Sequence, residues 1–270
     1  MKLLYGKPIA DEILAYLKSE ISLHDKKPGL AVILAGDDEA SKIYVGLKEK
    51  TAQEIGMNFF RFDLEANISE ESLIERIQKL NHDKLVNGII VQLPLPASFD
   101  TDKIISTISP DKDADGFLKK SKLLSPVFPK AIVKMIESSG RDLNQKKALV
   151  VANSAEFGEI MSQMLEQKGL LAKYVLSSEL PSNLGEIGSS DVVVSAVGSK
   201  GLLRGKMFKD GSIIIDGGIE KVGERVVGDV DRASFEGKNV FLTPVPGGVG
   251  PVTIACLLEN VYLAFKAQQD

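Results

Sequence analysis

A tyrosine and a lysine four positions apart form the first pair of side chains in this sequence that could do chemistry together. Tyr44 and Lys48 lie in the segment SKIYVGLKEK, and on a helix this spacing places both side chains on one face. A lysine removed from water has its charged form disfavoured, so its pKa falls and it can exchange protons near neutral pH. The same spacing also fits a solvated lysine that lies over a half-buried tyrosine.

Two further polar positions stand next to apolar segments. Gln92 ends the apolar run of GIIVQLPLP, where its amide could cap a strand or could hydrogen-bond Lys48 or a substrate. Asp113 and Asp115 lie in DKDADGF and could form a tight turn before the glycine. Alternatively, the Asp115 carboxylate could accept two hydrogen bonds from the adjacent donors of an amino-pyrimidinone ring.

The segment TPVPGGVGPVT, residues 243–253, is the most specific local pattern in the sequence. Prolines and glycines at this density, directly after an apolar run, predict a rigid loop. Glycines allow a ligand to approach the backbone closely, and the start of a following helix offers unpaired amide donors. The pattern therefore favours a binding loop for a flat ligand over an ordinary connection.

The composition excludes several classes of function. The formal net charge is −4, from 37 acidic and 33 basic residues, so we expect a small-molecule partner, no nucleic acid and no membrane. The single cysteine, Cys256, cannot form an internal disulfide or a cysteine metal cluster, and His24 and His82 lie far from the segments above. We therefore expect no metal. Residues 1–21 lack the pattern of a signal or transit peptide, and no apolar run predicts a membrane span, so we expect a cytoplasmic protein.

Alternating strands and helices are predicted to hold these side chains in place. Apolar residues at every fourth position, beginning after Pro8, predict an N-terminal helix up to Ile21. The runs LAVILAG, FFRFDL and GIIVQL predict strands, and residues 40–55 and 69–80 predict the helices between them. Gln92 then falls at the carboxyl end of a strand, which is where α/β proteins bind ligands.

The alternation lapses over residues 111–129, whose prolines and charges suit a linker, and it resumes at KALVVANS. The later runs ALVVA, AKYVL, DVVVSAV, SIIIDGG and NVFLTPV predict a doubly wound parallel sheet. We thus predict an α/β fold of two domains. The first comprises residues 1–120 and is completed by a C-terminal helix within 251–270, and the second, at 121–250, is Rossmann-like.

Taken together, five segments resemble the FolD family, the methylenetetrahydrofolate dehydrogenase/methenyltetrahydrofolate cyclohydrolases. These segments are YVGLK, GIIVQLPLP, PDKDADGF, GDVD and TPVPGGVGPVT, and they occur in the family's order over nearly the whole chain. The resemblance implies a folate-binding N-terminal domain, a Rossmann-like NADP-binding domain and an active site in the cleft between them. It also implies a homodimer.

The resemblance implies a role for particular residues. Lys48 matches the catalytic lysine, Gln92 the glutamine that sets its protonation state, and Tyr44 the helix tyrosine that shapes the folate pocket. Asp115 matches the pterin-binding aspartate. The other implied substrate-binding positions are Gly247, Gly248 and Pro251. The implied reactions interconvert 5,10-methylene-, 5,10-methenyl- and 10-formyltetrahydrofolate.

The implied cofactor-binding positions are Asn153, Ser154, Gly158, Ser177 and Ile219, and here the sequence departs from the family. A glycine and an arginine of the family's nucleotide loop are replaced by Ala152 and Asn153. Glu156 and Glu159 add negative charge where a dianionic cofactor would bind. Each of these changes opposes the binding of NADP.

Two more departures lie on the cofactor side. PVFP at 126–129 stands where the family has a proline-cysteine-threonine-proline segment, and a histidine of the family is missing around LSSEL. We therefore expect an enzyme whose cyclohydrolase half is better supported than its dehydrogenase half, with NADP, NAD or no cofactor. The alternatives are a cyclohydrolase alone and a non-catalytic folate-binding or assembly protein.

Overall fold

The chain folds into two compact units in the computed structural model, which describes residues 1–65, 67–118, 123–223 and 225–269. One unit comprises Met1–Ala10 and Phe128–Thr253, and the other comprises Asp11–Val127 and Ile254–Asp270. The domain boundary predicted between residues 120 and 121 lies outside the described residues. The first ten residues group with the second half of the chain, unlike the predicted division, because the strand at residues 2–3 pairs there.

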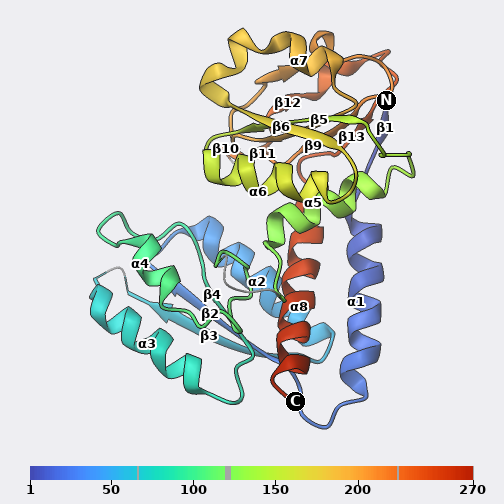
Figure 1. Ribbon diagram of the computed structural model, residues 1–270. Coiled ribbons are helices and arrows are strands. Elements are labelled where there is room, and N and C mark those ends of the chain that lie inside the picture. The colour runs from blue at the N-terminus through green and yellow to red at the C-terminus, as the bar shows by residue number, and fades with distance from the viewer. Residues whose placement is uncertain (66, 119–122, 224, 270) are drawn as a thin grey trace. The chain divides into compact units, whose positions relative to one another are not determined.

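The unit that contains Lys48 is built on a small parallel sheet (Figure 1). Its strands are β2 (Gly29–Ala35), β3 (Asn58–Leu64) and β4 (Gly88–Val91), in the order β3-β2-β4. The helices within it are α2 (Glu39–Glu54), α3 (Glu70–His82) and α4 (Thr101–Ser106). Two long helices, α1 (Gly6–Ser22) and α8 (Val249–Ala267), contribute most of their length to it.

The predicted strands and helices of this unit form for local reasons. β2 is buried along its whole length, which suits the central strand of a parallel sheet. The Asp38 side chain accepts from the Ser41 N–H at 2.7 Å and so caps α2, and Ser69 caps α3 in the same way. Apolar residues of α3 and α4 pack against β2 and β4 in one core. α8 lies against the same sheet, because a Cβ at Gly88 would meet the side chain of Val261.

The other unit contains a six-stranded parallel sheet in the order β1-β13-β9-β7-β5-β6. Its strands are β1 (Lys2–Leu3), β5 (Lys147–Ala152), β6 (Leu171–Leu176), β7 (Val192–Ala196), β9 (Ile213–Asp216) and β13 (Phe241–Leu242). Its helices are α5 (Val127–Glu137), α6 (Ala155–Glu166) and α7 (Leu184–Ser189). α7 covers one face of the sheet and α6 the other (Figure 1). The predicted doubly wound, Rossmann-like sheet is confirmed.

Short elements follow β7 and β9. β8 (Leu203–Arg204) pairs with β12 (Val230–Asp231), and β10 (Glu220–Val222) forms a hairpin with β11 (Arg225–Val227). Two buried carboxylates hold these segments. Asp216 accepts hydrogen bonds from the backbone N–H groups of Gly218, Asp229 and Val230. Asp229 accepts from the Ser195 hydroxyl at 2.6 Å and from two backbone N–H groups that follow β7.

Helix α8 is long and apolar enough to cross a membrane by length and composition alone. However, 67% of its apolar stretch is buried inside the protein, which is typical of a core helix. Asn260 on this helix is fully buried, and its Nδ2 donates to the carbonyls of Ala114 and Ser125 at 2.9 and 2.8 Å. α8 therefore fixes the segment that carries Asp115.

Candidate active site

Lys48 and Gln92 meet directly. Lys48 lies on α2 and is 5% exposed, and its Nζ donates to Gln92 Oε1 at 2.9 Å. Gln92 follows β4, and its own backbone N–H still donates to Ile33 of β2 at 2.8 Å. Its Nε2 donates to the carbonyl of Leu93 at 2.7 Å. Because this bond fixes the amide nitrogen, the amide oxygen must face Lys48.

Tyr44 lies beside the same amine. The Nζ of Lys48 is 4.8 Å from the centre of the Tyr44 ring, so the helical spacing brings both side chains to one place. A ring face attracts a cation at this distance. Burial, with the nearby Asp115 charge, raises the pKa of Tyr44 well above its ordinary value, so the phenol stays protonated and can donate a hydrogen bond.

Asp115 completes the group electrostatically. Burial lowers the pKa of Lys48, and the negative charge of Asp115 opposes part of that shift. In turn, burial raises the pKa of Asp115 to about 6, with Lys48 acting in the opposite direction and Asp113 in the same direction. Both groups are therefore shifted towards neutral pH, which is typical of functional sites.

The two aspartates of DKDADGF have different positions. Asp113 is fully buried, and its carboxylate accepts from the backbone N–H groups of Gly116 at 3.1 Å and Leu118 at 2.6 Å. It therefore forms the turn that the sequence suggested. Asp115 is held by this turn and interacts with Lys48 through its charge. The structure thus brings together Tyr44, Lys48, Gln92 and Asp115.

This group can move a proton. A buried amine whose pKa is lowered can lose its proton to become a base and can return it as an acid. The glutamine accepts from the amine without adding a charge, so it orients Lys48 and leaves the lowered pKa in place. Asp115 offers a carboxylate of the kind that binds two adjacent N–H donors.

The glycine-rich segment lies in the other unit, between β13 and α8. Gly247 has φ of 101°, which favours glycine. A Cβ at Gly248 would lie 2.6 Å from the carbonyl oxygen of Pro244, so the turn cannot hold a larger residue there without moving. Pro251 lies in the first turn of α8, where a proline leaves no hydrogen bond unmade. Gly247 and Gly248 therefore form a tight turn that leads directly into the helix that carries Pro251.

Four of the predicted cofactor-binding residues follow β5 or β6 at their carboxyl ends, namely Asn153, Ser154, Gly158 and Ser177. Asn153 directly follows β5, its Nδ2 donates to the carbonyl of Val197, and its Oδ1 accepts from the Ser177 hydroxyl at 2.9 Å. Ser154 caps α6 through the Phe157 N–H at 3.3 Å. The start of α6, which includes Glu156, is thereby placed where a dinucleotide pyrophosphate binds in Rossmann folds.

Gly158 and Ile219 have different surroundings. A Cβ at Gly158 would lie 2.5 Å from the ring of Tyr174 on β6. This glycine therefore lets α6 pack closely on the sheet, as the third glycine of a Rossmann loop does. Ile219 follows β9 and is 66% exposed, so its side chain is accessible to a ligand.

Phe128 occupies part of this edge. In the PVFP segment, Phe128 lies at the start of α5, and its ring centre is 5.6 Å from that of Phe157. It also approaches Gly217, because a Cβ there would come within 2.8 Å of the Phe128 ring. The segment that the sequence assigned to a linker is therefore helical from Val127 and packs against the first turn of α6.

The sequence assigned no role to three groups that support the predicted sites. The carbonyl of Leu93 accepts a hydrogen bond from the Gln92 amide, and no sequence pattern predicts such a backbone acceptor. Asp216 and Asp229 shape the loops after β7 and β9. Both aspartates lie in short segments that contain glycine, IDGG at 215–218 and GDVD at 228–231, and these segments were the available signal.

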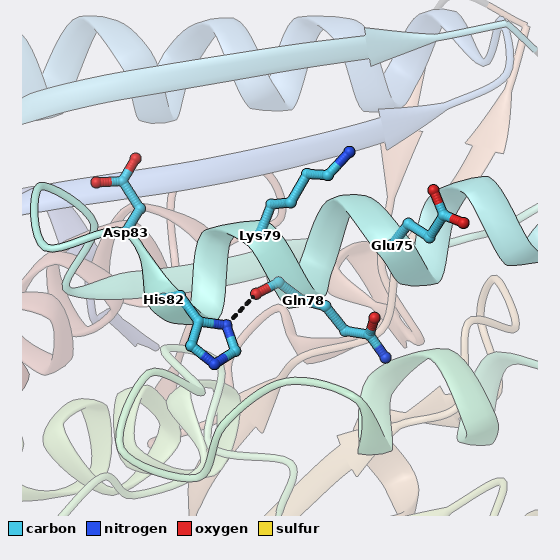
Figure 2. A pocket seen from close by; sticks show the side chains of 5 residues that line it. All are labelled: Glu75, Gln78, Lys79, His82 and Asp83. Atoms are coloured by element: carbon cyan, nitrogen blue, oxygen red, sulfur yellow. Dashed lines mark hydrogen bonds between the residues drawn. The ribbon is translucent and has the colours of Figure 1, made fainter.

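A hollow on the surface of α3 lies apart from these residues. Figure 2 shows its lining of Glu75, Gln78, Lys79, His82 and Asp83. The only bond drawn there joins His82 Nδ1 to the backbone carbonyl of Gln78 at 2.7 Å, within the helix itself. Mixed charges on one helix face are typical of a solvated surface.

Comparisons with known proteins cover both units. Residues 4–115 match the family model "Tetrahydrofolate dehydrogenase/cyclohydrolase, catalytic domain". Residues 126–269 match "Tetrahydrofolate dehydrogenase/cyclohydrolase, NAD(P)-binding domain". The second match includes the loop at 152–161, so the substitutions there do not remove this half of the chain from the NAD(P)-binding family.

Individual proteins of this family are similar to the chain over nearly its whole length. The chain is 39% identical to the bifunctional protein FolD of Vesicomyosocius okutanii, over 99% of this chain and all of that protein. A crystal structure of the bifunctional FolD of Campylobacter jejuni is 35% identical, with a TM-score of 0.93 and 99% of each chain covered. The Trypanosoma brucei enzyme, solved with NADP and an inhibitor, is 32% identical, with a TM-score of 0.92 and coverage of 99% of this chain and 98% of that one.

Proposed function

The chain belongs to the tetrahydrofolate dehydrogenase/cyclohydrolase family and is a bifunctional enzyme of one-carbon folate metabolism, and we propose that Lys48 moves the protons in its reactions. The substrate is a tetrahydrofolate derivative. In the first reaction the methylene carbon between N5 and N10 loses a hydride and becomes the methenyl cation. In the second, water adds to that carbon and the bond to N5 breaks, which leaves 10-formyltetrahydrofolate and releases one proton.

The observation that carries the proposal is the hydrogen bond from Lys48 Nζ to Gln92 Oε1 at 2.9 Å, made by an amine that is 5% exposed. Burial lowers the pKa of this amine, so its neutral form is accessible near neutral pH. In the hydrolytic step the neutral amine takes a proton from the attacking water. The ammonium then returns that proton to N5 as the ring opens.

Gln92 and Tyr44 position the amine and the folate. Gln92 holds Nζ in one direction, because its own nitrogen is fixed by the Leu93 carbonyl. Tyr44 has a pKa raised by burial and stays a neutral phenol, so it packs against the folate and donates a hydrogen bond. Neither residue needs to change its protonation state during turnover.

Asp115 binds the pterin ring. Its carboxylate accepts two hydrogen bonds from the amino-pyrimidinone, a match of two acceptors to two adjacent donors. We also assign Gly247, Gly248 and Pro251 to substrate binding, as the family resemblance implies. The family match over residues 4–115 supports the assignment of Asp115 to the folate.

A nicotinamide dinucleotide would supply the hydride acceptor for the first reaction, and residues of the larger sheet would hold it. The residues at the edge of the larger sheet fit a dinucleotide. Ser154 caps a helix whose N-terminus can face the pyrophosphate, and Gly158 allows that helix to pack closely. Asn153, Ser177 and Ile219 are the other residues that we assign to this site. We also propose that the enzyme is a homodimer, as the family resemblance implies, and that it is located in the cytoplasm, as the sequence pattern led us to expect.

Turnover of methenyltetrahydrofolate tests this function. We expect the purified protein to hydrolyse it, and Lys48→Ala to lower kcat by about two orders of magnitude or more, the usual contribution of a general acid or base. Calorimetric titration should show that Lys48→Ala still binds the folate, because Asp115 remains. Folate binding without turnover by the wild-type protein would instead indicate a binding or assembly protein.

Lys50→Ala is the matched control. Lys50 lies on the same helix, is exposed, and pairs only loosely with Glu54 at 3.9 Å. It should retain wild-type turnover. Equal losses in both variants would point to damage to α2 and would contradict a proton-transfer role for Lys48.

A further inference from the structure

Glu179 lies at the carboxyl end of β6, beside the predicted cofactor residues. Its Oε2 accepts from the backbone N–H of Leu176, the last residue of the strand, at 3.0 Å. The residue is exposed, so a ligand can reach the carboxylate. Ser177, which begins the same turn, connects to Asn153 at the end of β5. The glutamate is therefore held at the edge where β5 and β6 end together.

The carboxyl end of β6 corresponds to the position that contacts the adenosine ribose in dinucleotide-binding sheets. β5, α6 and β6 form the first βαβ unit, with β6 on the outer side of β5. In such a unit an acidic residue about 20 positions after the glycine loop hydrogen-bonds the adenosine ribose 2′-hydroxyl, whereas an arginine nearby accommodates a 2′-phosphate. Glu179 lies 21 positions after Gly158.

The charges along this edge have one sign. Residues 152–160 and 176–182 contain Glu156, Glu159 and Glu179 and contain no lysine or arginine. All three glutamates are exposed. A 2′-phosphate bound here would bring a dianion close to at least one carboxylate, and like charges at a few ångströms repel.

Asn153 gives this edge no cation either. Its Nδ2 donates to the carbonyl of Val197 and its Oδ1 accepts from Ser177, so its amide joins the ends of three neighbouring strands. An amide in this position holds the strand ends together but adds no positive charge for a phosphate.

We propose that Glu179 makes this enzyme select NAD over NADP, by accepting a hydrogen bond from the free ribose 2′-hydroxyl and repelling a 2′-phosphate. The inference rests on the proposed function, because it concerns the cofactor of the dehydrogenase reaction. It also gives a physical meaning to the substitutions at 152–159. They adapt the site to a different nucleotide and leave the dinucleotide fold intact.

Lys200 is a rival partner for a 2′-phosphate, because it follows the strand next to β5. It is exposed and follows β7, which lies on the side of β5 opposite to β6. Its backbone N–H donates to Glu220 at 2.6 Å. A lysine there is placed to meet another part of the dinucleotide, so Lys200→Ala should weaken NAD and NADP equally.

Calorimetric titration of NAD and NADP into the full-length protein tests the proposal without any turnover. We expect the wild-type protein to bind NAD about tenfold more tightly than NADP or better. Glu179→Gln keeps an oxygen for the Leu176 N–H and removes the charge, so the preference should fall to about parity. Glu236→Gln, an exposed glutamate distant in sequence from the nucleotide loop, should keep the wild-type ratio.

Three results would overturn the proposal. They are equal or tighter binding of NADP by the wild-type protein, an unchanged ratio in Glu179→Gln, and no binding of either nucleotide. A NADP affinity lost selectively in Lys200→Ala would also overturn it, because Lys200 would then be the partner of a bound 2′-phosphate. Hydrolysis of methenyltetrahydrofolate by the same sample needs no nucleotide, so it reports separately on the proposed function.

Discussion

At the residue scale, the bond between Lys48 and Gln92 joins an ionisable donor to a neutral acceptor. A carboxylate in place of Gln92 would hold the lysine charged, and a solvated lysine would keep its ordinary pKa. The amide does neither, because its nitrogen is fixed by Leu93 and only its oxygen faces the amine. Residue identity at position 92 therefore sets the pH range in which Lys48 can act.

Gln92→Glu tests that control. The new carboxylate would favour the ammonium form and raise the pKa of Lys48. If the neutral amine is the base, the rate of methenyltetrahydrofolate hydrolysis rises with pH through this pKa. The rising limb of the wild-type pH–rate profile should lie below the ordinary lysine value, and in Gln92→Glu it should move up by about one pH unit or more. Gln92→Met, which adds no charge, is the control, and an unmoved limb in Gln92→Glu would exclude Lys48 as the base.

Asp115 should make folate affinity depend on pH. Burial raises its pKa to about 6, and only the ionised carboxylate accepts both hydrogen bonds from the pterin. Below that pKa the folded protein holds a proton that the ligand must displace, so affinity falls as pH falls. The Kd for a tetrahydrofolate should rise about tenfold between pH 7.5 and pH 5. Asp115→Asn should bind weakly without this dependence; a variant that kept the pH dependence would assign it to another group.

The sequence identified these residues by type and spacing but left their partners open. The separation of Tyr44 and Lys48 predicts one helix face, and the end of an apolar run places Gln92 at the end of a strand. The local pattern did not distinguish Asp113 from Asp115, because two acidic residues before a glycine fit a turn equally well, and only the family resemblance singled out Asp115. Only the backbone N–H groups of Gly116 and Leu118 distinguish them.

At the element scale, strands with continuous apolar runs were predictable and short connections were not. β2, β5 and β7 are almost entirely buried, and their continuous apolar runs predict this burial. The first three residues of α5 were assigned to a linker because Pro126 and Pro129 flank Val127 and Phe128, although a proline is tolerated in the first turn of a helix. β1 has two residues, and its pairing with β13 joins segments more than two hundred positions apart, which no local pattern can predict.

The loops after β7 and β9 depend on the carboxylate of Asp229. It is fully buried, and it accepts from the hydroxyl of Ser195 and the backbone N–H groups of Val197 and Ser199. Asp229→Asn places an amide nitrogen against one of these donors, so a buried polar group loses its partner. We expect the free energy of unfolding to fall by about 1–3 kcal/mol. The melting temperature should fall by several degrees.

Glu236→Gln is the control for that measurement, because Glu236 is an exposed carboxylate in the same unit. Its melting temperature should match the wild type. An Asp229→Asn variant as stable as the wild type would mean that the three donors find water or other acceptors, and that the carboxylate does not hold the loops.

At the scale of the whole molecule, two units carry two kinds of chemistry. The proton-transfer group lies in the unit of Asp11–Val127 and Ile254–Asp270, and the nucleotide edge lies in the unit of Met1–Ala10 and Phe128–Thr253. Composition and the break in the strand–helix alternation predicted two domains, and the doubly wound sheet of the second followed from its apolar runs. The grouping of residues 1–10 with the second unit could not be predicted from the sequence, since it depends on the pairing of β1 with β13.

The measurement that tests the central claim most directly is the product balance of the wild-type enzyme. The protein is supplied with 5,10-methylenetetrahydrofolate and with NAD or NADP, and reduced nucleotide and 10-formyltetrahydrofolate are quantified in the same reaction. A bifunctional enzyme forms both in equal amounts once the methenyl intermediate is consumed. Hydrolysis of added methenyltetrahydrofolate, with no reduced nucleotide formed from the methylene substrate, would contradict the account and leave a cyclohydrolase alone.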